Sequence, residues 1–333
     1  DFDSECPLKA WLASPWNEAR KPVNGTHFDI GTAAHLAVLE PELLRNRIVT
    51  HEFDTYHTKE SRAIRDDAYA AVRAAFEERS VLVLRGQPVT DELQVAYSKR
   101  FGPLEIAKAA SRGEGTPFSI LTNIEPDGRL VPPDHKEALR ARANQLWHTD
   151  SCFKDPPALA SVLSARVVAK VGGETEFASM RLGWERLPET KRARFADAYA
   201  WHDYAYSRGK ISPTMISTRE RSTLPPVRWR IRWRNPANGR DSLYIASHTY
   251  AIDGMPEGEA QALLAELIEH TTAAGHTYLH HWQPGDVIMW DNRCVLHRGR
   301  PWPDDQPRHV VRTTITATDA DGLAAMRPMR PAA

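Results

Sequence analysis

The chain has 333 residues, of which 41% are hydrophobic and 26% are charged, and its 43 Lys and Arg residues balance its 43 Asp and Glu residues. This length suits one or two domains with a sizeable core, and the zero net charge argues against a general nucleic-acid or anionic-membrane binder. Three scattered cysteines exclude a disulfide framework, the acidic start is unlike a signal peptide, and there is no run of 18 apolar residues. We therefore expect a cytoplasmic protein with no nucleic-acid and no membrane partner.

Residues 1–70 are predicted to be mainly helical, because apolar side chains recur at helical spacing over 30–44 before a polar, charged stretch. A helix in VRAAFEERS, a short buried strand in SVLVLRG and a helix over 90–100, begun by a Thr/Asp cap, follow in that order. Residues 105–143 are rich in Gly, Pro and charged residues, which predicts a long loop around one strand at 118–123.

Further strands are predicted where apolar, β-branched segments alternate with turns, at 158–168, 228–234, 242–247, 287–290 and 310–316. Helical spacing predicts two insertions between them, at 180–199 and 257–274. The tail after Asp319 has no such pattern and is expected to fray. The predicted fold is mainly β with helical insertions (α+β), with a sheet-rich domain over 71–320 and a flexible tail over 321–333.

The sharpest motif is His148-Thr149-Asp150. In an extended segment, residues two apart project from the same face, so the imidazole and the carboxylate can bind one metal ion. His297, which follows the 287–290 strand and a polar turn, offers a third ligand. Two His and one carboxylate are typical of non-haem Fe(II) oxygenases. The motif alone is weak, because an isolated histidine in such a pattern is more often a core residue.

Arg312 lies in the strand-like run HVVRTTIT, four residues after Arg308. An unpaired guanidinium inside a protein is costly, and its planar fork suits a carboxylate. This favours a bound acid as the partner of Arg312. The alternative is a surface arginine on an edge strand.

Several longer motifs follow one another between residues 72 and 318, namely SVLVLRGQPVTDE, FGPLE, NQLWHTDSCFKDPPA, SARVVAKVGGETEFASM, GDVIMWDNRCVLHRGRPW and RHVVRTTIT. They resemble the taurine and 2,4-dichlorophenoxyacetate dioxygenase family, and within it the phenoxyalkanoate branch. The resemblance implies a double-stranded β-helix, or jelly roll. It also implies an enzyme that uses Fe(II), 2-oxoglutarate as cosubstrate, and O2.

The same resemblance assigns individual residues. It implies that iron is bound by His148, Asp150 and His297. It implies that 2-oxoglutarate is held at its far carboxylate by Thr175 and Arg312, with Arg308 as a second basic residue nearby, and that Asn144 lines the pocket. For Thr175, the alternative is a turn residue after Gly172 and Gly173.

The implied substrate is a small organic acid, above all an aryloxyalkanoate. Hydroxylation next to its ether oxygen would give a phenol and a 2-oxo acid, with release of succinate and CO2. The retained Asp150 argues against halogenation, because halogenating relatives lack this carboxylate. The same chemistry on a sulfonate such as taurine, or on another small carboxylate, is the alternative, and self-association stays open.

Substrate contacts are less defined by the sequence. Lys108, Arg112 and Lys154 are the candidate cations for an anionic substrate, although solvated surface charge is the commoner role for each. Four aromatic residues are candidates either for a pocket wall or for the core: Trp184, Trp201, Tyr204 and Tyr206.

Residues 1–70 depart from this family. PLKAWLASPWNE and DIGTAAHLAVLEPELL resemble the opening of phage-type PD-(D/E)xK exonucleases, where the counterpart of His35 lies near the metal site. No downstream aspartate and ExK pair follows, and a nuclease needs those acidic ligands, so we expect an inert fragment. A metal-dependent nuclease with an accessory jelly roll is the alternative of a different class, and a non-catalytic jelly-roll binding protein is a third.

Overall fold

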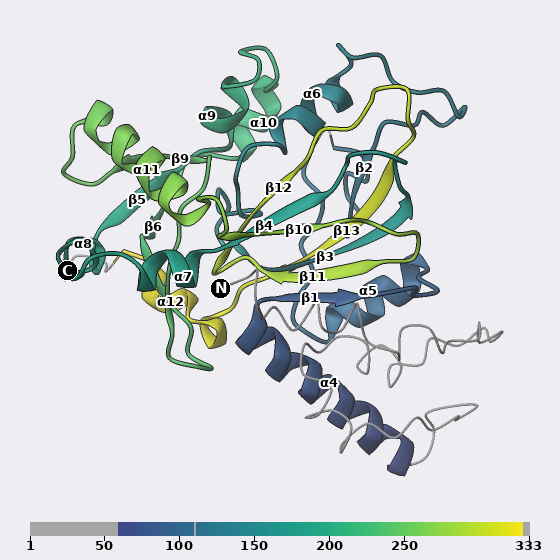
Figure 1. The fold of residues 1–333 in the computed structure, drawn as a ribbon, viewed down its shortest axis with the longest axis horizontal. Helices are drawn as coiled ribbons and strands as arrows, with labels where there is room; N and C mark the ends of the chain where they lie inside the picture. The colour runs from purple at the N-terminus through teal and green to yellow at the C-terminus, as the bar shows by residue number, and fades with distance from the viewer. Residues whose placement is uncertain (1–58, 110, 329–333) are drawn as a thin grey trace.

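The computed structural model describes residues 59–109 and 111–328, and a five-stranded antiparallel sheet lies at its centre (Figure 1). The strand order is β1-β11-β3-β13-β2, so segments far apart in the sequence are neighbours. The bounds are β1 Val81–Leu84, β2 Phe118–Thr122, β3 Ala158–Val167, β11 Val287–Asp291 and β13 His309–Thr316. All five strands were predicted from their apolar, β-branched sequences.

A second antiparallel sheet has the order β10-β4-β12, and its strands were not among those predicted from local sequence patterns. Its strands are β4 Thr175–Ser179, β10 Thr277–His280 and β12 Val295–Gly299. In its register, Phe177 of β4 lies opposite His297 of β12. This sheet therefore carries one of the candidate metal ligands.

The two sheets enclose a small apolar core. Along β11, Ile288 and Trp290 belong to this core, whereas Val287 and Met289 belong to a larger core on the other face, as the period of two in a strand requires. Phe177 of β4 and other residues of the second sheet complete the small core. The five-stranded sheet is thus buried on both faces.

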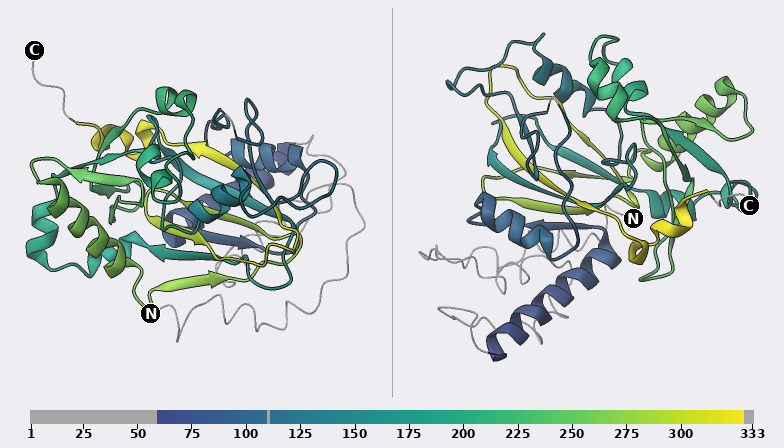
Figure 2. Two further views of the ribbon diagram at one scale, coloured as in Figure 1. Left: turned by 90° about the horizontal axis from the view of Figure 1, so that it is seen from above. Right: turned by 180° about the vertical axis from the view of Figure 1, so that it is seen from behind.

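Two helices cover the outer face of the five-stranded sheet, as Figures 1 and 2 show. They are α4 Lys59–Arg79, which contacts β1 and β11, and α5 Asp91–Lys99, which contacts β13. The hydroxyl of Thr90 accepts a hydrogen bond from the Leu93 N–H at 3.3 Å, which confirms the predicted cap. Phe76 of α4 and Tyr97 of α5 are buried in the larger core.

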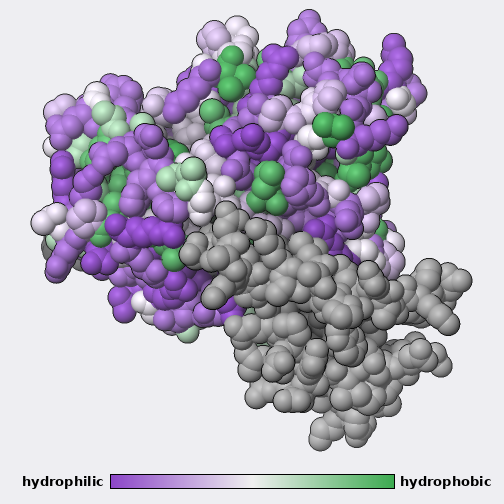
Figure 3. Space-filling view, viewed as in Figure 1, coloured by the Kyte–Doolittle hydropathy of each residue, from purple (hydrophilic) through white to green (hydrophobic). Residues whose placement is uncertain are grey.

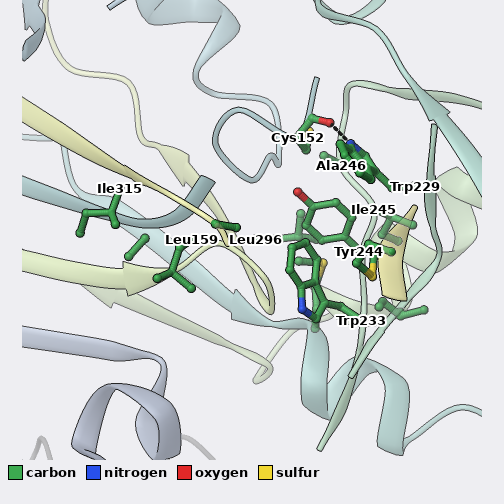
Figure 4. Close-up of a cluster of buried hydrophobic side chains, with 14 of the residues drawn as sticks. Cys152, Leu159, Trp229, Trp233, Tyr244, Ile245, Ala246, Leu296 and Ile315 are labelled. Atoms are coloured by element: carbon green, nitrogen blue, oxygen red, sulfur yellow. Dashed lines mark hydrogen bonds between the residues drawn. The ribbon is translucent and has the colours of Figure 1, made fainter. Parts of the chain in front are cut away.

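The larger core continues into a lobe beside the sheets. Its elements are α7 Met180–Glu185, α8 Glu189–Phe195, β5 Tyr199–His202, β6 Val227–Arg230, β7 Arg232–Arg234, β8 Asp241–Leu243, β9 Thr249–Ile252 and α11 Glu257–Thr271. Figure 4 shows Trp229, Trp233 and Tyr244 packed there, with the Trp229 indole donating to the Cys152 carbonyl at 2.8 Å. The predicted helix at 180–199 is therefore two short helices followed by a strand, and the predicted strand at 228–234 is broken at Ile231.

The segment predicted as a long loop contains a helix, α6 Lys136–Ala143. In Figure 1 this helix lies near α9 Tyr204–Gly209 and α10 Thr218–Thr223, at one end of the sheets. The prediction of a loop failed because KEALRARA is short and strongly charged, and its apolar face is only three alanines and a leucine.

The tail differs from the expected frayed segment over residues 319–328. It forms a 3-10 turn, Asp319–Asp321, and α12 Leu323–Met326. Leu323 and Met326 are 2% and 1% exposed, so they are anchored in the larger core. Residues 329–333 lie outside the described part.

Residues 1–58 also lie outside the described part, and with them the predicted N-terminal helices and His35. Within 59–109 and 111–328, no helix combines the length and apolar character needed to cross a membrane. On the face shown in Figure 3, hydrophilic residues predominate among the coloured atoms and hydrophobic ones form small separate groups.

Candidate active site

The structure brings His148, Asp150 and His297 together. One ligand atom from each lies within 4.8 Å of the others, and the three residues are 4%, 4% and 5% exposed. The Nε2 atom of His148 is 4.0 Å from Oδ1 of Asp150, and the Nε2 atom of His297 is 3.6 Å from Oδ2. Within the described residues this is the only such group of three or more His, Cys, Asp or Glu side chains.

The main chain holds the two histidines side by side. His148 N–H donates to the His297 carbonyl at 3.0 Å, and His297 N–H donates to the His148 carbonyl at 2.8 Å. The His-x-Asp motif was expected in an extended segment, but His148 forms only this isolated bridge, and Asp150 lies in the turn that follows. The bridge attaches the His-x-Asp motif to the edge of β12.

Hydrogen bonds orient each side chain. The Nδ1–H of His148 donates to the Leu146 carbonyl at 2.7 Å, which leaves Nε2 free to bind a metal. Ser161 donates to Oδ2 of Asp150 at 2.6 Å, and Asn292 donates to Ser161 at 3.0 Å. Asn292 also accepts the Asp150 N–H at 3.1 Å. Ser161 and Asn292 were not predicted, since neither stands in a metal-ligand pattern.

The electrostatics give the protonation states that a metal requires. Burial lowers the pKa of His148 to about 4 and lowers that of His297 well below 6.5, so both rings are neutral at pH 7. Burial by itself raises the pKa of Asp150, but the positive charge of the Arg312 guanidinium and the hydrogen bond from Ser161 help to outweigh it, and the pKa lies below its usual value. Two neutral nitrogens and one carboxylate oxygen are a donor set that fits Fe(II).

A cavity of about 440 Å³ opens over these three residues. All the predicted metal, 2-oxoglutarate and charged substrate residues line it: His148, Asp150, His297, Thr175, Arg308, Arg312, Asn144, Lys108, Arg112 and Lys154. Nine Lys or Arg residues line the cavity against four Asp or Glu residues. The cavity is thus strongly basic in a chain of zero net charge.

Thr175, Arg308 and Arg312 occupy different parts of the wall. The Thr175 hydroxyl accepts from the Trp282 indole at 3.0 Å. The guanidinium of Arg308 donates to the Gly173 carbonyl at 3.1 Å, whereas that of Arg312 pairs with Asp150. The guanidinium against residues 173–175 is therefore that of Arg308, and Arg312 points to the candidate metal ligands.

The predicted substrate cations are all paired. Lys108 donates to Glu220 at 2.7 Å, Arg112 lies 3.0 Å from Glu125, and Lys154 pairs with Glu105. The structure also places an unpredicted cation in the wall, Arg208, which donates to Asn144 Oδ1 at 3.3 Å. Its sequence context, YAYSRGK, gave no sign of burial.

Of the four aromatic candidates, Tyr204 lines the cavity. Trp184 is packed in the larger core, Trp201 donates to Asp253 at 2.9 Å, and Tyr206 packs on Tyr250 with ring centroids 5.7 Å apart. Phe153 and His248, which were not predicted, join Tyr204 in the cavity wall.

Comparison with known sequences gives related dioxygenases. The chain is 39% identical over 254 residues to alpha-ketoglutarate-dependent 2,4-dichlorophenoxyacetate dioxygenase of Cupriavidus pinatubonensis, covering 75% of this chain and 88% of that protein. It is 36% identical over 269 residues to (S)-phenoxypropionate/alpha-ketoglutarate-dioxygenase of Sphingobium herbicidovorans, covering 78% of this chain and 90% of that protein.

The fold has a solved counterpart in AAD-2, whose crystal structure holds Mn(II) and N-oxalylglycine. The TM-score is 0.69 at 36% sequence identity, over 75% of this chain and 87% of AAD-2. The model of the "Taurine catabolism dioxygenase TauD, TfdA family" matches residues 44–314. The match also includes residues 44–71, which lie before the motifs that resemble this family. The chain belongs to the TauD, TfdA family of dioxygenases.

Proposed function

We propose that this dioxygenase hydroxylates a small organic acid of the aryloxyalkanoate type, using Fe(II), 2-oxoglutarate and O2 and releasing succinate and CO2. Hydroxylation next to the ether oxygen gives a hemiacetal that collapses to a phenol and a 2-oxo acid. The observation that carries the proposal is the cluster of His148, Asp150 and His297 in the wall of a basic cavity. The relatives that act on 2,4-dichlorophenoxyacetate and phenoxypropionate support the substrate class.

His148, Asp150 and His297 would hold the iron. With 2-oxoglutarate and O2, the bound iron supplies oxidation of a substrate C–H bond. The protein contributes two imidazoles kept neutral by burial and a carboxylate kept ionised. Ser161 fixes the direction of that carboxylate through its hydrogen bond of 2.6 Å.

Thr175, Arg308 and Arg312 would bind 2-oxoglutarate. Arg308 is buried, has no carboxylate within 4.0 Å in the described part of the chain, and lies against Gly173, two residues before Thr175. Burial lowers the pKa of Arg308 to about 10, which still leaves it a cation at pH 7. These observations support Arg308 and Thr175 as the binding pair for the far carboxylate, with Arg312 nearer the metal.

Membership of this family also supports a specific fold for the catalytic unit. The two antiparallel sheets with their shared apolar core are the expected halves of a double-stranded β-helix. In that arrangement His297 belongs to the smaller sheet and its bridge brings His148 alongside. The similarity to AAD-2 supports this assignment.

The test has two stages. Purified protein with Fe(II) and 2-oxoglutarate under anaerobic conditions should give a weak visible charge-transfer band, which His148→Ala and Asp150→Ala abolish. Aerobic turnover with phenoxyacetates, phenoxypropionates and sulfonates should then give succinate and phenol with the aryloxy acids. A band without coupled turnover of any aryloxy acid would reject the substrate class, and absence of the band would reject the dioxygenase mechanism.

The nuclease alternative has a separate outcome. Degradation of DNA that needs Mg(II) and disappears in His35→Ala would support it, and His35 lies outside the described residues. The candidate metal ligands do not favour a nuclease. They are two histidines and a single carboxylate, whereas Mg(II) prefers oxygen ligands.

A further inference from the structure

The hydroxyl of Thr175, in the cavity wall, is hydrogen-bonded to the indole of Trp282. The Nε1 atom of Trp282 lies 3.0 Å from Oγ1 of Thr175. An indole N–H can only donate, so the threonine oxygen must accept in this contact. The O–H proton of Thr175 has no acceptor among the described residues. Thr175 is buried, and a buried donor without an acceptor is costly, which points to an acceptor supplied by a ligand in the cavity.

The smaller sheet and the segment that follows β10 fix the position of Trp282. His280 lies opposite Thr175 in the register of β10 and β4, and Trp282 follows two residues later. The His280 ring meets the Trp282 ring edge-on, with centroids 4.7 Å apart and an angle of 82° between the ring planes. Trp282 packs against the small apolar core and is not one of the residues that line the cavity. It therefore reaches a ligand in the cavity only through Thr175.

A buried carboxylate holds the turn that carries Trp282. Asp286 is fully buried, and its Oδ2 atom accepts from the Gln283 N–H at 2.8 Å and from His280 Nε2 at 3.1 Å. The same oxygen pairs with Arg85. Three donors on one buried oxygen leave the turn little freedom to move. The indole N–H consequently keeps its direction toward Thr175.

Thr175 and Arg308 contribute differently to the binding of an acid. The guanidinium of Arg308 attracts any anion, whereas a single hydroxyl proton of fixed direction favours an acceptor at one position. A 2-oxo acid with a carboxylate at its far end can supply that acceptor, and a 2-oxo acid with a methyl group at the same place cannot. The hydroxyl of Thr175 would therefore distinguish 2-oxo acids by their far end.

We propose that Trp282 is a positioning residue for the cosubstrate, because its N–H occupies the oxygen of Thr175 and turns the threonine proton toward the far carboxylate of 2-oxoglutarate. This inference rests on the proposed function. It adds a residue behind the cavity wall to the recognition of the cosubstrate. The role of Trp282 is to raise the affinity for a dicarboxylate, and the candidate metal ligands are not involved.

The experiment compares 2-oxoglutarate with 2-oxopentanoate, which has the same chelating end but a methyl group in place of the far carboxylate. Each acid is titrated anaerobically into protein loaded with Fe(II), and the half-maximal concentration is read from the charge-transfer band. Trp282→Phe keeps an aromatic ring and removes the N–H. We expect the half-maximal 2-oxoglutarate concentration to rise about 5-fold, as for the loss of one neutral hydrogen bond, and that of 2-oxopentanoate to stay unchanged.

Thr175→Val separates positioning from a purely structural role. This substitution removes the hydroxyl and keeps the branched shape, and it should raise the half-maximal 2-oxoglutarate concentration about 10-fold. If Trp282 acts through the hydroxyl, adding Trp282→Phe to Thr175→Val causes no further loss. A structural role would instead weaken binding by the same factor in both backgrounds, and it would weaken 2-oxopentanoate as well.

Trp201→Phe is the matched control, because the Trp201 indole donates to Asp253 at 2.9 Å and neither residue lines the cavity. It should bind both 2-oxo acids as wild type does. The proposal is wrong if Trp282→Phe binds 2-oxoglutarate as wild type does, weakens both acids equally, or adds its full loss to that of Thr175→Val. If Trp282→Phe does not fold, Trp282→Met replaces it in the same cycle, since methionine is a flexible apolar side chain without a donor. Absence of the band in wild type instead rejects the proposed function.

Discussion

His148 and His297 are hydrogen-bonded to each other through both main-chain groups, at 3.0 Å and 2.8 Å. The two imidazoles consequently start from adjacent backbone positions, and their ring centroids are 4.2 Å apart. Because His297 also pairs with Phe177 in the register of β12 and β4, the position of the candidate metal site is set by a sheet. Such a site keeps its ligands close together before any metal binds.

Ser161→Ala should weaken iron binding without unfolding the protein. The substitution removes the hydroxyl that donates to Oδ2 of Asp150 at 2.6 Å, so the carboxylate loses the group that fixes its direction. We expect the affinity for Fe(II) to fall about 10- to 100-fold. The measurement is an anaerobic Fe(II) titration in the presence of 2-oxoglutarate, read from the visible band.

Ser164→Ala is the matched control for this prediction. Ser164 lies on the same strand, and its hydroxyl donates to Gln94 at 2.8 Å, away from the metal ligands. It should keep the Fe(II) affinity of wild type. Equal losses in the two variants would show that the strand, and not the contact with Asp150, controls the site.

Gly173→Ala should impair 2-oxoglutarate binding. Gly173 has φ +73°, and an added Cβ would lie 3.1 Å from Nε of Arg308, so the guanidinium must move. We expect the 2-oxoglutarate concentration for half-maximal band intensity to rise about 10-fold or more, as for loss of one charge-assisted contact. Gly275→Ala has the same backbone strain, with φ +77°, but no atom within 4 Å of the added Cβ. If both variants bind 2-oxoglutarate alike, the contact with Arg308 is unimportant.

The central strands were predictable, and the smaller sheet was not. Strand β3 has ten residues, and its first eight are all buried. Its sequence is therefore a long, mostly apolar run, which indicates a strand. Strand β12 has five residues, VLHRG, and includes a histidine, an arginine and a glycine. Its pairing with β4 depends on contacts distant in the chain, which local spacing does not encode.

The residues of the candidate site were likewise predictable only in part. The spacing of His148 and Asp150, together with the family motifs, predicted residues that the structure brings to one cavity. Ser161 and Asn292 were missed because their hydrogen bond joins residues 131 positions apart, and ordinary serines and asparagines carry no local signal. Arg208 was missed because burial of a charged residue in a six-residue helix depends on the elements packed around it.

Glu77→Gln should destabilise the fold by about 2–3 kcal/mol, as expected when a buried ion pair loses one charge and the other charge keeps a second partner. Glu77 lies on α4 and accepts from Arg293 at 2.6 Å, and Arg293 is 1% exposed and also pairs with Asp291. Urea unfolding at neutral pH measures the change. Glu266→Gln, which removes an exposed pair with Lys191, should cause no measurable loss. Similar values for both variants would contradict an anchoring role for the buried pair.

His202→Gln should make the protein less sensitive to acid. His202 is fully buried, and burial lowers its pKa from 6.5 to about 3. In the unfolded chain the imidazole takes up a proton below about pH 6.5, whereas the folded protein does so only near pH 3, so protonation favours unfolding throughout that interval. The free energy of unfolding is thus lost as the pH falls from about 6.5 toward 3, by up to about 1.4 kcal/mol per pH unit from this residue. Between pH 7 and pH 5, the loss in His202→Gln should be smaller than in wild type by about 2 kcal/mol, measured by urea unfolding at both pH values. Other buried histidines contribute equally to both proteins, so parallel pH dependences would mean that His202 is protonated in the folded state as readily as in the unfolded one.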